Sequence, residues 1–144
     1  MIESSYVKLL KKIKLFAILA LVLDIILFLV LGVFALVNSQ LIIGLFQLLV
    51  SMYIMFQIKL AADKLLYSPL FSPVLVHYII KISYACFISG IGSTILDTII
   101  YSVQEGGVYL CLHLTTIGIG FLLYVGAYIF EYGCDMEDEY SLTV

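Results

Sequence analysis

The chain has 144 residues, of which 64% are hydrophobic and 12% charged, and its formal net charge is −3. A soluble domain is about 45–50% apolar and about 25% charged, so the composition excludes an ordinary water-soluble domain and favours a chain that lies mostly in lipid. All seven cations are lysines, the last of them Lys81, and they leave no basic face for direct nucleic-acid binding.

Four apolar segments are candidates for membrane-spanning helices, each of which needs about 20 mostly apolar residues. We place them at residues 15–37, 41–58, 82–103 and 108–130. These lengths predict an all-α membrane protein, a four-helix bundle with one transmembrane domain over residues 1–144. Residues 131–144 form an acidic tail of this domain.

The segments around the spans carry further signals. Before the first span, apolar residues share one helical face among the lysines, which predicts an interfacial amphipathic stretch: Tyr6, Leu9, Leu10 and Ile13. Residues 59–73 form the only long connection. Its prolines, Pro69 and Pro73, predict the end of the second helix and a start of the third near Val74. Lys81 interrupts the following apolar run.

Lysine placement predicts the orientation of the chain. Four lysines precede the first span and two lie between the second and third, whereas the connections "NSQ" and "QEGG" contain none. Lysine-bearing regions next to spans stay in the cytoplasm. Both termini are then cytoplasmic, and the two short outer turns predict two antiparallel helical hairpins.

Three ionisable side chains fall inside the spans: Asp24, Asp97 and His113. A charge in lipid costs about 2.5–3.5 kcal/mol on insertion scales, so each group needs a partner. At about 1.5 Å per residue, Asp97 lies about 9 Å and His113 about 8 Å below the same surface. We therefore predict a hydrogen bond between these two side chains. Asp24 lies nearer the centre of its span, and a tyrosine hydroxyl is its candidate partner.

Small and polar residues form a stripe on each of the last two spans, which predicts close packing of these helices. The stripe on the third span is Cys86, Ser89, Gly90, Ser93 and Asp97, and that on the fourth is His113, Thr116, Gly120, Tyr124 and Ala127.

The polar residues leave two interpretations open. Asp24, Asp97 and His113 could exchange protons as a substrate moves, as in a small proton-coupled transporter. Alternatively, they hold packed helices together or sense a small ligand. We find no catalytic set, no metal-ligand spacing and no phosphate loop, so we expect neither an enzyme nor a cofactor or metal.

Two stretches resemble a bacterial membrane family, the domain-of-unknown-function 2975 family. Its C-terminal pattern is a glycine after the last span, a hydrophobe, an acidic run and a closing Leu-Thr-Val. These places are taken by Gly133, Met136, Glu137–Glu139 and 142–144. "FSP" at 71–73 resembles the start of the family's third helix. The resemblance implies a four-span protein of the bacterial inner membrane, often encoded beside a small Xre-type helix-turn-helix regulator.

The acidic tail also has two interpretations. It could be screened by the N-terminal lysines, in exposed pairs that contribute only about 0–1 kcal/mol each. It could instead dock a basic partner by charge complementarity, with apolar anchors at alternating positions as in an added strand. The candidate partner-binding residues are Met136, Glu137, Asp138, Glu139, Leu142 and Val144.

We therefore expect a non-enzymatic regulatory or sensory membrane protein, involved in signalling, that binds a cytoplasmic protein through its tail and the 59–73 loop. The small proton-coupled transporter is the alternative. The expected partners are the lipid bilayer, a helix-turn-helix regulator and a second copy of the chain in a homo-oligomer.

Overall fold

The computed structural model describes residues 5–35, 38, 41–67, 72–107 and 110–142, the last six of these by their helical backbone only. Four α-helices make up the fold: α1 (Ser5–Ala35), α2 (Leu41–Leu65), α3 (Pro73–Glu105) and α4 (Leu114–Leu142). Each of the four is long and apolar enough to cross a membrane. The expected all-α architecture with four candidate spans is therefore confirmed.

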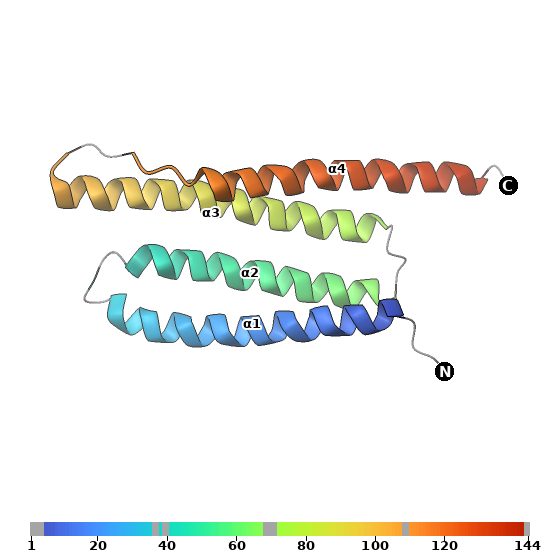
Figure 1. Ribbon diagram of the computed structural model, residues 1–144, viewed down its shortest axis with the longest axis horizontal. Coiled ribbons are helices and arrows are strands. Elements are labelled where there is room, and N and C mark those ends of the chain that lie inside the picture. The colour runs from blue at the N-terminus through green and yellow to red at the C-terminus, as the bar shows by residue number, and fades with distance from the viewer. Residues whose placement is uncertain (1–4, 36–37, 39–40, 68–71, 108–109, 143–144) are drawn as a thin grey trace.

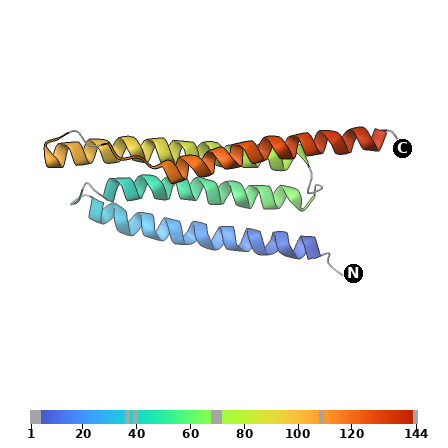
Figure 2. The ribbon, with the colours of Figure 1, turned by 45° about the horizontal axis from the view of Figure 1, so that its top comes forward.

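The helices lie in a row in chain order (Figure 1). α2 packs against both α1 and α3, and α3 packs against α4. Within the described part of the chain, no Cα atom of α1 comes within 8 Å of α3 or α4, and none of α2 within 8 Å of α4. The turned view shows α4 lying across α3 (Figure 2). The row is thus open, and α1 and α4 do not meet.

The two ends of the row differ. α1 begins and α4 ends at the same end, where α4 extends past the other helices in both views (Figures 1 and 2). At the opposite end, α3 reaches beyond the start of α4 (Figure 1). The offset between α3 and α4 makes room for a non-helical segment beside α3.

Several helix boundaries differ from the predicted ones. α1 begins at Ser5, so the lysine-rich stretch continues directly into the first span. α2 continues to Leu65 and shortens the long connection. α3 starts at Pro73 after an extended Ser72, close to the predicted start, and runs unbroken through Lys81. Proline fits there because its fixed φ suits a first helical residue and its missing N–H is not needed.

Small side chains occupy the interior, and large apolar ones face outward. The buried residues include Ala17, Ala62, Ala85, Ala127, Ser83 and Ser93. Large exposed hydrophobic side chains are spread over all four helices. In lipid this distribution is favourable, because helices gain by close backbone approach and lose nothing by exposing leucine and isoleucine.

Two glycines set the distance between α3 and α4. A Cβ on Gly120 would lie 3.2 Å from both Cys86 Cβ and the Ser83 carbonyl oxygen. A Cβ on Gly90 would lie 2.5 Å from Ile117 Cγ1. The two predicted stripes therefore do face each other, since Cys86 and Gly90 belong to one of them and Gly120 to the other.

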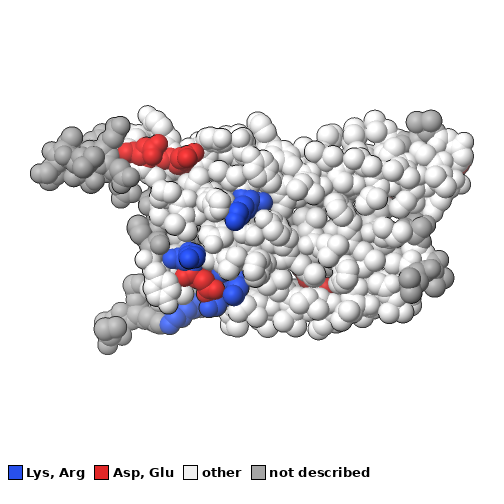
Figure 3. All heavy atoms as spheres, turned by 180° about the vertical axis from the view of Figure 1, so that it is seen from behind, with Lys and Arg blue, Asp and Glu red and all other residues white. Residues whose placement is uncertain are grey.

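Charged side chains join α1 to α2 at the lysine-rich end. The Asp63 carboxylate forms ion pairs with Lys14 Nζ at 2.5 Å and with Lys59 Nζ at 3.4 Å. The Tyr6 hydroxyl donates to the Leu65 carbonyl oxygen at 3.3 Å. Seen from behind, most blue and red atoms gather toward one end of the molecule, and the rest of that face is largely white (Figure 3).

Candidate functional site

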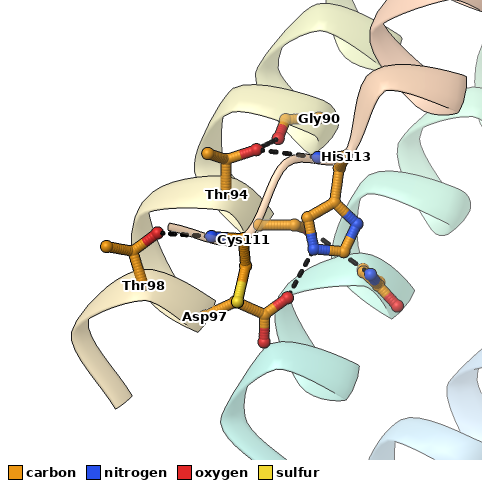
Figure 4. A network of polar contacts seen from close by, with 8 residues as sticks. Gly90, Thr94, Asp97, Thr98, Cys111 and His113 are labelled. Atoms are coloured by element: carbon orange, nitrogen blue, oxygen red, sulfur yellow. Dashed lines mark hydrogen bonds and ion pairs between the residues drawn. The ribbon is translucent and has the colours of Figure 1, made fainter. Parts of the chain in front are cut away.

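A non-helical segment precedes α4 and lies against α3 (Figure 4). Residues 110–113 are not helical, and α4 starts only at Leu114. The prediction of a helix from residue 108 is therefore wrong, and His113 lies just before α4 rather than within it. Residues 108 and 109 lie outside the described part.

Two threonines of α3 hold this segment. The Cys111 N–H donates to Thr98 Oγ1 at 3.3 Å, and the His113 N–H donates to Thr94 Oγ1 at 3.2 Å (Figure 4). Thr94 Oγ1 itself donates to the Gly90 carbonyl oxygen at 2.8 Å. The spacings match, because two residues of extended chain rise about 6.6 Å and four residues of helix about 6 Å.

His113 is the residue at which the chain becomes helical again. Its carbonyl oxygen accepts the Ile117 N–H at 3.3 Å, which makes it the N-cap of α4. Its backbone is thus bonded on both sides, to Thr94 before the helix and to Ile117 within it. This arrangement holds the backbone of His113 in place beside α3.

The imidazole of His113 contacts the carboxylate of Asp97. His113 Nε2 and Asp97 Oδ2 are hydrogen-bonded, so the predicted pair is confirmed (Figure 4). The Asp97 side chain is 14% exposed and that of His113 is 30% exposed. Asp97 also lies beside the N-terminal end of α4, where the helix dipole favours a negative charge. The hydrogen bond gives each of the two side chains a polar partner.

The depth of this pair follows from a bond to α2. Gln47 Nε2 donates to Ser93 Oγ at 3.4 Å, and Ser93 directly precedes Thr94. Gln47 lies six residues after the start of α2, which places this layer about 9 Å inside that end of the helix. Asp97 lies four residues further along α3, about 6 Å nearer that end, so the pair is about 3 Å inside the start of α2. Asp97 still lies eight residues before the end of α3, within a helix long and apolar enough to cross a membrane.

Asp24 has a different partner from the one expected. Ser51 Oγ of α2 donates to Asp24 Oδ2 at 2.7 Å, so the predicted tyrosine partner is wrong. A serine suffices because α1 and α2 pack closely and bring the two side chains to one level. Since α1 does not approach α3 or α4 within 8 Å, Asp24 lies apart from the Asp97–His113 pair.

A hollow of about 220 Å³ is lined by residues of α2, α3 and α4. Its lining combines apolar side chains with Gln47 and Ser51 of α2, Cys86 and Ser89 of α3, and Thr116 of α4. Ser51 is the partner of Asp24, whereas Gln47 is bonded to Ser93, the residue before Thr94.

The candidate tail residues lie on the last turns of α4. The helix continues to Leu142, so the backbone here is helical and not extended as an added strand would be, and binding by these residues stays a prediction. Met136 is exposed, and so are the acidic residues Glu131 and Asp135 before it. For Glu137, Asp138, Glu139 and Leu142 the backbone is helical, and Val144 lies outside the described residues.

Sequence reasoning missed the threonines and the serine that hold these groups. Thr94 and Thr98 carried a usable signal, because a four-residue spacing places both on the face of α3 that also carries Asp97. For Ser51, the sequence carried no signal apart from the depth of the residue in its span. Among the described residues, no three His, Cys, Asp or Glu side chains form a metal site.

Comparison of the chain with protein-family models, curated proteins and solved structures gave no match. The resemblance to the domain-of-unknown-function 2975 family stays a prediction from the motifs at 71–73 and 133–144.

Proposed function

We propose that the chain is a non-enzymatic regulatory membrane protein that docks a cytoplasmic partner on the end of α4. The observation that carries the proposal is the continuous helix from Leu114 to Leu142, which leaves the row of helices and extends past it (Figure 1). A helix end of this kind offers a rigid surface to a partner groove, as in helix-in-groove recognition.

The proposal includes a topology. We place both termini in the cytoplasm of a bacterial inner membrane, with the helices as two antiparallel hairpins. Support comes from the lysines, which lie near the start of α1, near the end of α2 and, for Lys81, in the third turn of α3. The positive-inside rule assigns the end where α1 begins to the cytoplasm.

Charge supports a basic partner. Glu131 and Asp135 are exposed near the end of α4, and no ion pair joins them to another described residue. Among the described residues, no Cα atom of α1 comes within 8 Å of α4, so the two helix backbones lie apart. A small helix-turn-helix regulator has the required basic face, and charge complementarity would speed its binding.

Deletion of residues 134–144 tests this proposal. We expect the full chain, purified gently from its native membrane, to retain a soluble basic protein that the truncated chain loses. Glu131→Gln with Asp135→Asn should weaken retention and reduce its dependence on salt. Asp97→Asn, which is remote from the tail, is the matched control and should retain the partner. Retention by the truncated chain would contradict tail docking.

The proton-coupled transporter remains a second candidate, carried by the Asp97–His113 contact at membrane depth. In proteoliposomes with an imposed pH gradient, Asp97→Asn should then abolish proton flux, whereas tail deletion should leave it unchanged. If neither the wild-type chain nor its variants conduct protons, this second candidate is wrong and the docking proposal is unaffected.

A further inference from the structure

An apolar groove runs along one side of the α2–α3 interface. Two adjoining hollows form it, because they share Phe46, Tyr84 and Ile88. The first has a volume of about 290 Å³, and apart from Lys81 its lining is apolar or aromatic: Phe46, Leu49, Val50, Tyr53, Tyr84, Ala85 and Ile88. The second continues the groove to Ile91 and Gly92. The groove is separate from the Asp97–His113 pair, because neither residue of the pair lines it and neither do Thr94 and Thr98.

The length of the groove corresponds to one leaflet of a bilayer. Lys81 marks one end and Gly92 the other, eleven residues further along α3. At 1.5 Å per residue this is about 16 Å, or half of the roughly 30 Å hydrocarbon core. Gly92 shapes the far end, because a Cβ there would lie 2.5 Å from Cζ of Phe46. The groove therefore has the reach of a single acyl chain.

Lys81 is the one charged residue in the lining. Asp63 binds Lys14 and Lys59, and no ion pair joins Lys81 to any described acid. Its ammonium lies 5.8 Å from the ring centroid of Tyr78, a weak partner for a cation within a span. A lysine near a helix end extends its ammonium toward the headgroup layer, where phosphate is available.

We propose that this groove binds one anionic phospholipid of the leaflet at the lysine-rich end, with an acyl chain between α2 and α3 and its phosphate on Lys81. Charge complementarity selects this occupant, because an uncharged or zwitterionic lipid would fill the groove but leave the ammonium without a net negative partner. The proposal does not depend on docking at α4.

Lipid exchange in nanodiscs tests the proposal on the full chain. Native mass spectrometry would count phosphatidylglycerol and phosphatidylcholine bound from an equal mixture. We expect wild type to prefer phosphatidylglycerol about fivefold, the ratio that about 1 kcal/mol for one lysine at an anionic surface gives. Lys81→Gln should remove the preference, and Lys64→Gln should keep it. Lys64 is the matched control, because it is an exposed lysine of α2 outside the groove.

Ile88→Trp provides a second, independent variant. Ile88 is 60% exposed, so a larger side chain there fills the groove without entering the helix interior. Both lipids should then bind less, whatever their headgroup. The proposal is overturned if wild type shows no preference, if Lys81→Gln keeps it, if Lys64→Gln loses it, or if Ile88→Trp binds lipid as wild type does.

Discussion

Asp97 and His113 are each tolerable in the membrane because the other is present. Their hydrogen bond gives each side chain a polar partner, and Asp97 gains further from the N-terminal end of α4. Asp24 has only the Ser51 hydroxyl as a described partner. At the level of single residues, the Asp97–His113 pair is therefore the contact whose loss should matter most.

A double-mutant cycle measures this contact. Asp97→Asn and His113→Gln should each lower the free energy of unfolding in detergent by about 1–2 kcal/mol, since each replaces an ionisable partner by a neutral amide that makes a weaker hydrogen bond. The double variant should cost less than the sum, with a coupling energy of about 0.5–1.7 kcal/mol. Denaturant titration monitored by circular dichroism provides the values.

Asp97→Asn combined with Ser51→Ala is the matched control, because these residues belong to separate polar pairs. Their effects should add to within about 0.5 kcal/mol. Additivity in the Asp97–His113 cycle itself would contradict a direct bond. The pair was predictable from sequence because a short turn fixes the relative depth of two consecutive spans. The Asp24–Ser51 bond was not, because depth alone does not select among the hydroxyls of a neighbouring helix.

The element that distinguishes this fold is α4, which starts and ends further along the chain than the predicted span at residues 108–130. Hydropathy located its apolar residues but not its first turn, because hydropathy counts apolar side chains and carries no information on backbone conformation. The late start depends on Thr94 and Thr98, whose hydroxyls accept N–H groups that would otherwise be unpaired in lipid. The late end is compatible with the sequence, because no proline follows residue 114 to break the helix.

Threonine-to-valine exchanges test the first of these points. Valine keeps the shape of threonine but offers no acceptor. Thr98→Val should therefore accelerate amide hydrogen exchange at Cys111, and Thr94→Val at His113, each by about tenfold or more if about 1–3 kcal/mol of protection is lost. Thr115→Val, an exposed threonine of α4, is the control and should leave both amides unchanged. Equal exchange in all variants would show that the hydroxyls do not hold the segment.

As a whole molecule, the protein is an open row with its small side chains inside and its large ones outside. Composition predicted four spans, since the apolar segments are long enough and well separated. It did not predict the open row, because every helix is apolar on several faces and sequence alone does not say which of them meet. The proposed topology also concerns the whole molecule, because it states on which side of the membrane each end of the row lies.

Cysteine labelling in spheroplasts tests the topology. Gly107 is exposed just after α3, and Lys64 is exposed in the last turn of α2, at the opposite end of the row. In a background in which Cys86, Cys111 and Cys134 are replaced by serine, a membrane-impermeant maleimide should label Gly107→Cys but not Lys64→Cys. After lysis both should react. Labelling of Lys64→Cys in intact spheroplasts would show that the orientation is the opposite of the proposed one.

The bonds from Thr94 and Thr98 to the segment before α4 also bear on how the protein is made. A helix can leave the insertion machinery alone because it satisfies its own backbone, whereas the N–H groups of Cys111 and His113 are bonded to hydroxyl groups of α3. We therefore expect α3 to wait beside the translocon until α4 has been synthesised. The last two helices then enter the bilayer as one unit, so biogenesis of this chain proceeds in three steps rather than four.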